Sequence, residues 1–292
     1  TRRSSDLFSH RYILGLYEVL ERIFGPRPHI LFESCSSGGN RFDLGMLSFS
    51  HQVWSSDNTD PIERLKIQEG LSYLYPLSTI SAHVSAEVHQ QTLRVTPLST
   101  RFNVASFGVL GYELDLNLLN HVERKEIKEQ IKWYKQHRSL FQTGTFYRHD
   151  KVKDNLVSWQ VTQADTSCVG LFQTLAEAGP SGDRLVVSGL EEKSLYQVSA
   201  KPQRVMVERF GELIKHVSPV SINPKGTLFK SINKYYALAD QKQEVIASGA
   251  LLKFGLHLNA QFMGTGYHKD LRLWGDFGST LYLISKREKD ND

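Results

Sequence analysis

Residues 30–43 read ILFESCSSGGNRFD, a short apolar run that leads directly into a polar segment with two adjacent glycines. Ile30, Leu31 and Phe32 stand between turn-forming residues, a pattern typical of a buried strand in a parallel sheet. Residues 33–43 would then form a loop at the carboxyl end of that strand, which is where parallel α/β folds hold their ligands. The stretch therefore predicts a β/α unit with a candidate site at its end.

The same alternation of helix and strand extends on both sides of this stretch. Apolar residues recur at helical spacing over residues 10–24, and Gly and Pro residues then end that helix. Further elements are expected as strands at 52–54, 78–83 and 102–110, and as helices at 62–74 and 122–138. In the first of these helices we place Glu63, Arg64 and Lys66 on the solvated face. This alternation favours a parallel α/β fold, either a barrel or an open sheet.

The hydrophobic pattern of the sequence changes after about residue 145. Short apolar and period-two segments follow, separated by Gly, Pro, Ser and Asn, at 156–161, 169–172, 185–187, 195–198 and 280–284. Such segments are typical of strands in an antiparallel sandwich. We therefore expect two domains, one over residues 1–145 and one over residues 146–292.

Composition excludes several classes of partner. The 292 residues are 40% hydrophobic and 23% charged, as in an ordinary globular protein. The net charge of +4 is spread along the chain, so neither nucleic acid nor a membrane surface is an expected partner. Cys35 and Cys168 are too far apart in sequence to indicate a disulfide framework, and a reducing compartment fits better. No apolar run reaches membrane-helix length and no signal peptide is visible, so we expect a cytoplasmic protein.

A second polar segment follows the predicted strand at 52–54, where residues 52–61 read QVWSSDNTDP. The face of Trp54 can stack on a sugar ring, and Asp57 and Asp60 are candidates for proton transfer or for binding hydroxyl groups. The structural alternative is that an aspartate caps the helix that begins near Pro61, and Asp60 is the better placed of the two. That assignment leaves Asp57 available for chemistry.

The first polar segment also has two interpretations. Its paired glycines let backbone approach a ligand closely, and its Ser, Cys, Asn and Arg side chains can hydrogen-bond to it. The alternative is a tight βα turn in which Arg41 makes a structural ion pair. Neither segment has the spacing of a metal site, and His83 and His89 lack a third ligand nearby. We therefore expect no metal and no cofactor.

Taken together, residues 31–47, 54–60 and 64–68 resemble glycoside hydrolase family 36, the bacterial and fungal α-galactosidases, as do residues 10–17 and 275–280. The likeness spans nearly the whole chain. It implies the second half of a (β/α)8 TIM barrel followed by an antiparallel β-sandwich domain. It also implies retaining hydrolysis of terminal α-galactosyl residues from galacto-oligosaccharides such as melibiose and raffinose.

The resemblance assigns roles residue by residue. Asp57, the acid after Trp-x-Ser, matches the general acid/base of the family. Cys35 and Gly38 fall in the SCxxGGxR segment that lines the galactose pocket, Trp54 falls at the pocket wall, and Arg41 matches the arginine of that motif. The family's nucleophile lies in a Lys-Trp-Asp strand motif before the first helix, and this sequence contains no such motif. We therefore expect a fragment that is inactive on its own.

The sequence departs from the family pattern at two places. Asn40 stands where a third glycine is common, and residues 87–90, Glu-Val-His-Gln, replace a Pro-Asn-His-like stretch, which bears on recognition of the aglycone. Two alternatives stay open: a galactosyltransferase of the raffinose-synthase kind, and a non-catalytic carbohydrate-binding remnant. By analogy with the family, a homo-oligomer is expected for the full-length enzyme.

Overall fold

The computed structural model describes residues 2–150, 153–179, 182–218, 223 and 225–287. Its helices are α1 (Arg2–Phe24), α2 (Leu44–Leu47), α3 (Pro61–Leu71), α4 (Leu98–Ala105), α5 (His121–Thr143), α6 (Thr227–Tyr235) and α7 (Gly249–Phe254), with the 3-10 segments η1 (Leu77–Thr79) and η2 (Val207–His216). Its strands are β1 (Glu33–Ser34), β2 (Gln52–Trp54), β3 (Ile80–Ser85), β4 (Val109–Glu113), β5 (Thr145–Arg148), β6 (Leu156–Gln163), β7 (Thr166–Gln173), β8 (Arg184–Leu185), β9 (Leu195–Ala200), β10 (Arg204–Met206), β11 (Ala237–Ala239), β12 (Glu244–Ser248), β13 (Leu256–His257) and β14 (Ser279–Lys286).

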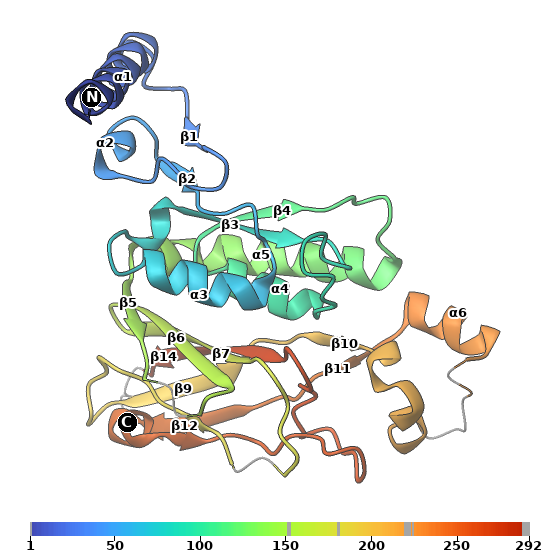
Figure 1. Cartoon of the computed structure of the whole chain (residues 1–292). Coiled ribbons are helices and arrows are strands. Elements are labelled where there is room, and N and C mark those ends of the chain that lie inside the picture. Colours follow the sequence, from blue (N-terminus) through green and yellow to red (C-terminus); the bar gives the residue numbers. More distant parts are fainter. Residues whose placement is uncertain (1, 151–152, 180–181, 219–222, 224, 288–292) are drawn as a thin grey trace.

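The N-terminal part is a four-stranded parallel sheet in the order β1-β2-β3-β4. Its strands run in one direction, so their carboxyl ends meet at one edge. Helices α3, α4 and α5 cover one face of β3 and β4, while α1, α2 and the first two strands form a lobe that projects from the layered body (Figure 1). Side chains therefore alternate between a face against these helices and an open face.

The C-terminal part is built on a six-stranded antiparallel sheet in the order β12-β9-β14-β7-β6-β5. Helices α3, α4 and α5 lie between this sheet and the parallel sheet (Figure 1). The Phe107 ring makes aromatic contacts with Phe141, Phe146, Trp159 and Phe172, at centroid distances of 5.2 to 6.1 Å. Because these rings come from both halves of the chain, the two parts share one hydrophobic core.

The other face of the antiparallel sheet has a second core, which includes Leu185, Tyr196, Leu252 and Trp274. The elements that cover it there include the short pair β8–β13 and helix α7. The sandwich expected from the period-two segments is thus formed, with one large layer and one small one. A third, smaller core lies under η2, α6 and the β10–β11 pair.

Most predicted elements are confirmed, with boundaries shifted by up to eight residues, the largest shift being at the start of α1. The strand expected over 102–110 is wrong in its first half, because residues 98–105 form α4 and only β4 is a strand. Every residue of α4 is buried. Because this helix is buried on all sides, its polar residues do not gather on one solvated face, and the sequence shows no helical period there.

The strand expected at 30–32 is also wrong. The ladder begins at Glu33, and Ile30 and Leu31 are 41% and 81% exposed. Phe32 instead stacks on Phe24 of α1, with ring centroids 4.6 Å apart. The apolar pattern assumed burial on both faces, and the described residues provide no such cover for this run.

Candidate active site

The loop after β2 carries the acid singled out from the sequence. Asp57 is exposed at the carboxyl edge of the parallel sheet, and the indole Nε1–H of Trp54 donates a hydrogen bond of 2.9 Å to its Oδ1. Trp54 is the last residue of β2, so a regular strand fixes the donor. The strand thereby sets the direction in which the carboxyl group of Asp57 points.

Arg64 of α3 binds the backbone of this loop through hydrogen bonds. Its guanidinium donates to the carbonyls of Asn58 at 2.8 Å, Ser56 at 2.7 Å and Ser81 at 3.1 Å. It also lies 5.0 Å from the ring centroid of Trp54, a cation–π contact. A rigid fork of donors that spans several carbonyls at once is a property that lysine lacks. The loop that bears Asp57 is therefore tied both to the next strand and to α3.

The solvated position expected for Arg64 is wrong, since the residue is only 2% exposed. Gln68, four residues further along α3, is buried on the same side and donates to the carbonyls of Val104 and Phe107. Burial lowers the pKa of Arg64 to about 10, while the carboxylates of Glu113 and Asp57 act in the opposite direction. The group still carries its charge at neutral pH.

The two glycines of the first polar segment lie against the Asp57 loop. Gly38 and Gly39 have φ of +74° and +95°, a backbone region that favours glycine. A Cβ on Gly38 would lie 2.8 Å from the backbone nitrogen of Asp57, and one on Gly39 would lie 2.7 Å from the carbonyl oxygen of Ser55. The two polar segments found separately in the sequence are therefore packed backbone to backbone.

Cys35 and Arg41 take different positions. Cys35 directly follows β1, the neighbour of β2, and its free thiol is exposed. Arg41 turns toward α1, where its guanidinium donates to the hydroxyl of Tyr12 at 3.0 Å and lies 5.9 Å from that ring. The structure thus brings Gly38, Trp54 and Asp57 together and directs Arg41 to the helix behind them.

Polar residues on the open face of the sheet were not singled out from the sequence. The carboxylate of Glu33 accepts hydrogen bonds from Gln52, at 2.5 Å, and from the hydroxyl of Ser81. The strand register places Glu33, Gln52 and Ser81 on the same face as Trp54. Polar Ser81 and His83 alternate with apolar Ala82 and Val84 along β3, and this alternation was the available signal.

His83 extends this polar surface toward β4. Its ring lies 4.5 Å from that of Trp54, and its Nδ1 is 3.7 Å from Oε2 of Glu113. Burial lowers the pKa of His83, and the carboxylates of Glu113 and Glu33 oppose the shift. The open face therefore offers two carboxylates, an indole and an imidazole.

Asp60 has the structural role expected of it. Its side chain caps α3 by accepting from the backbone nitrogens of Ile62 and Glu63, and it forms an ion pair of 2.6 Å with Arg94. His89 likewise hydrogen-bonds Thr59, at 3.1 Å.

In the part of the chain that the structure describes, no group of three or more His, Cys, Asp or Glu side chains could hold a metal ion. No helix described there is both long enough and apolar enough to span a membrane.

An acid, an indole and a glycine-rich loop at the carboxyl edge of a parallel β/α sheet are arranged as one side of the active site of a barrel-type glycoside hydrolase would be. Comparison with known families agrees: residues 2–144 match the Melibiase family, and residues 156–284 match the glycosyl hydrolase family 36 C-terminal domain. The chain belongs to glycoside hydrolase family 36.

Curated relatives support this membership. The chain is 48% identical over 191 residues to alpha-galactosidase 1 of Pediococcus pentosaceus, a match that covers 64% of this chain and 26% of that protein. It is 47% identical over 193 residues to alpha-galactosidase AgaA of Geobacillus stearothermophilus, which covers 65% and 26% respectively. The matched segments are thus about a quarter of the length of these relatives.

Solved structures resemble the chain over nearly its full length. A variant of AgaA from Geobacillus stearothermophilus in complex with raffinose is 35% identical, with a TM-score of 0.72, and the match covers 95% of this chain and 32% of that one. The alpha-galactosidase from Lactobacillus brevis is 33% identical, with a TM-score of 0.74. That match covers 97% of this chain and 32% of the other chain.

Proposed function

We propose that this chain supplies the acid/base side of the active site of a retaining α-galactosidase. The observation that carries the proposal is the exposed carboxyl of Asp57, oriented by Trp54 at the carboxyl edge of the parallel sheet. The relatives named above are alpha-galactosidases, and other AgaA variants are solved with stachyose or with 1-deoxygalactonojirimycin. Terminal α-galactosides of that kind are the proposed substrates.

In this proposal each site residue has a distinct role. Asp57 protonates the leaving glycosidic oxygen and then takes a proton from the water that hydrolyses the glycosyl-enzyme. Trp54 orients Asp57 and forms the pocket wall, and Cys35 and Gly38 line the galactose site. Arg41 keeps the glycine-rich segment in place through its contact with α1.

A retaining mechanism also needs a nucleophilic carboxylate about 5–5.5 Å from the acid/base. We assign that role to no residue of this chain. We further propose that the chain divides near residue 145, because α5 ends at Thr143 and the first antiparallel strand begins at Thr145. The catalytic part is then residues 1–145, and the antiparallel part supports it through the shared core around Phe107.

The test is Asp57→Ala in the enzyme that contains this chain together with the nucleophile segment. Activity on raffinose, which has a poor leaving group, should fall by about 10²- to 10⁴-fold, because protonation of that leaving group is lost. With an aryl α-galactoside, which has a good leaving group, the rate of glycosyl-enzyme formation should fall much less. The glycosyl-enzyme should then accumulate, and azide should restore turnover because it attacks without deprotonation.

Asp60→Ala is the matched control, since Asp60 caps α3 and lies three residues from Asp57. It should lower the melting temperature, and its effect on activity should be the same for raffinose and for the aryl substrate. If Asp57→Ala slows both substrates equally and azide has no effect, Asp57 is a binding residue and the proposal is wrong.

A further inference from the structure

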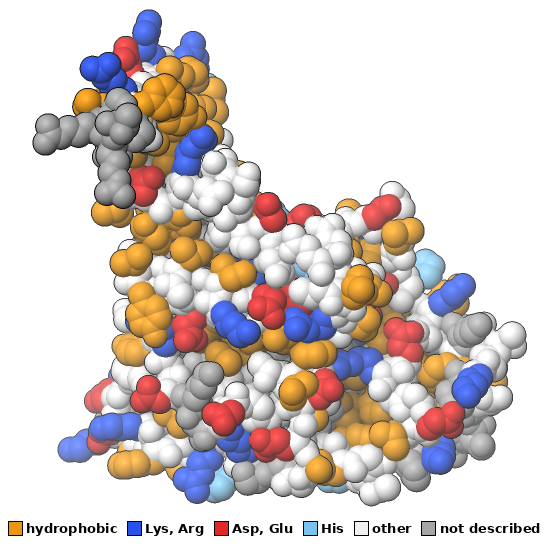
Figure 2. All heavy atoms as spheres, viewed as in Figure 1, with side chains coloured by type: hydrophobic (Ala, Val, Ile, Leu, Met, Phe, Trp, Pro, Cys, Tyr) orange, Lys and Arg blue, Asp and Glu red, His pale blue; other side chains and the backbone are white. Residues whose placement is uncertain are grey.

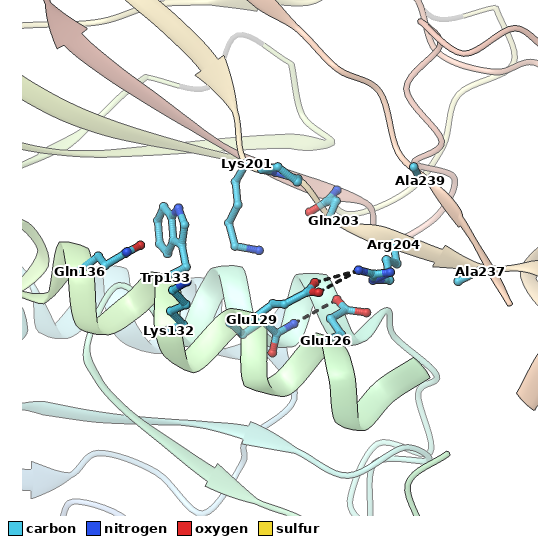
Figure 3. Close-up of a pocket in the computed structure, with 12 residues that line it drawn as sticks. Glu126, Glu129, Lys132, Trp133, Gln136, Lys201, Gln203, Arg204, Ala237 and Ala239 are labelled. Atoms are coloured by element: carbon cyan, nitrogen blue, oxygen red, sulfur yellow. Dashed lines mark hydrogen bonds and ion pairs between the residues drawn. The ribbon is translucent and has the colours of Figure 1, made fainter. Parts of the chain in front are cut away.

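A cavity lies on the opposite side of α5 from the parallel sheet. Its volume is about 450 Å³, within the range of small-molecule sites. One wall is α5, which contributes Glu126, Gln130 and Trp133, and the other wall is the turn from β9 to β10 and the start of β11 (Figure 3). The cavity thus lies between the two parts of the chain and away from Asp57.

Lys201 is the most unusual group in this cavity. The residue is 7% exposed, and its backbone nitrogen is fixed by a 2.7 Å hydrogen bond to the carbonyl of Leu281. Its Nζ lies 4.7 Å from the ring centroid of Phe102 and 5.7 Å from that of Trp133. Glu126 and Glu129 attract the ammonium through their charge, but among the described residues its Nζ donates no hydrogen bond. Because this ammonium lines the cavity without a protein acceptor, it can donate hydrogen bonds to a ligand bound there.

Glu126 faces Lys201 from α5 without touching it (Figure 3). It is 5% exposed and, within the described part of the chain, accepts one hydrogen bond, of 3.0 Å, from Gln130. Burial raises the pKa of Glu126 and lowers that of Lys201, and the opposite charge of each partner opposes the other's shift. The neighbouring Glu129 is already paired with Arg204 at 2.9 Å. A strong acceptor and a strong donor therefore face the same space with unused capacity.

We propose that this cavity is a second carbohydrate-binding site, distinct from the pocket at Asp57, for a neutral hydroxylated ligand of mono- or disaccharide size. A sugar hydroxyl can accept from Lys201 and donate to Glu126 at the same time, whereas an anion would meet the glutamates and a cation would meet Lys201 and Arg204. The indole of Trp133 provides an apolar surface for the C–H face of a sugar ring. Gln130 and Gln203 also line the cavity, and their amide groups are held in place by hydrogen bonds within the protein.

The experiment measures equilibrium binding of glucose, galactose and sucrose by calorimetry to the enzyme that contains this chain. Lys201→Met and Glu126→Gln should each weaken sugar binding at this cavity by about tenfold or more. That is the expected effect of losing a hydrogen bond to a charged group. Methionine packs well against the rings of Phe102 and Trp133, and glutamine keeps the contact with Gln130, so both variants should fold. Turnover of an α-galactoside should be unchanged in both.

Lys193→Met is the matched control, because Lys193 is exposed on the connection between β8 and β9. It should leave binding of all three sugars unchanged. Melting curves of all variants separate loss of binding from loss of folding. The inference is overturned if none of the three sugars binds saturably outside the Asp57 pocket, or if folded Lys201→Met and Glu126→Gln variants bind as tightly as the parent. A failure of Asp57→Ala to show leaving-group dependence would not affect this result.

Discussion

Gly38 is the residue at which the two polar segments meet. A side chain there would face the backbone nitrogen of Asp57 at 2.8 Å, and φ of +74° is costly for a β-branched residue. Gly38→Val in the complete enzyme should therefore displace the Asp57 loop, and kcat/KM for raffinose should fall by about 100-fold, as for a displacement of about 1 Å. Steady-state kinetics and melting curves would be measured together.

Gly70→Val is a suitable control, because a Cβ at Gly70 would have open space around it. It should leave kcat/KM unchanged. If Gly38→Val lowers the melting temperature sharply while the folded fraction keeps its affinity and rate, the glycine serves only the turn.

Arg64 is a positioning residue for Asp57, because it binds the carbonyls of Ser56 and Asn58 on either side of it. Arg64→Lys keeps the charge but cannot reach both carbonyls and Ser81 together. We expect kcat on raffinose to fall by about 10- to 100-fold with KM nearly unchanged, because proton transfer depends on the orientation of Asp57 more than substrate binding does. A lower melting temperature with an unchanged kcat would show a purely structural role.

At the scale of elements, the start of α3 depends on Asp60. Burial alone would raise the pKa of Asp60, but hydrogen bonds from Thr92, Arg94 and the backbone of Ile62 hold it below its ordinary value of 3.8. Asp60→Asn keeps a cap and loses the ion pair with Arg94, so unfolding free energy should fall by about 1.5–3 kcal/mol at pH 7. Denaturant unfolding would measure the difference.

The pH dependence of this difference follows from the sign of the shift. A carboxyl whose pKa is lower in the folded state contributes stability that is complete above its unfolded pKa and lost as pH falls through the folded value. The gap between parent and Asp60→Asn should thus be constant from about pH 5 to pH 8 and shrink below about pH 3.8. A gap that shrinks between pH 8 and pH 5 would assign the effect to another group.

At the scale of the whole molecule, the open face of the parallel sheet and the projecting lobe are the exposed regions. Hydrophobic side chains gather on this lobe, including Phe8 at 73% and Leu31 at 81% exposure (Figures 1 and 2). Monomeric proteins seldom expose apolar groups in such a cluster. These surfaces are therefore suited to contact with other protein.

The 292 residues alone should not turn over an aryl α-galactoside, because no residue of the sequence matches the nucleophile motif and a retaining mechanism requires a second carboxylate. The measurement is release of the aryl group by the purified chain, with the same chain carrying Asp57→Ala as a blank. Turnover above the blank would mean that a carboxylate of this chain, such as Glu33 or Glu113, acts as nucleophile.

The sequence alone determined most of the helices and strands and the family, and it singled out Asp57 as the candidate acid. Local patterns were sufficient for these because they report directly on helical or alternating burial, as in α5 and β9, and on cap chemistry, as at Asp60. The motif around Asp57 is contiguous, so its spacing is visible without a fold.

Tertiary structure alone decided which charged groups are buried and what they touch. The sequence pattern predicts a solvated face for Arg64, but the carbonyls of the Asp57 loop cover its guanidinium. The segment of α4 resembles a strand in sequence because both sides of this helix are covered. Lys201 and Glu126 are 75 positions apart, from 126 to 201, and only the packing of α5 on the antiparallel sheet brings them to one cavity. Local patterns encode the exposure of a residue to water, whereas these contacts depend on which distant segment replaces that water.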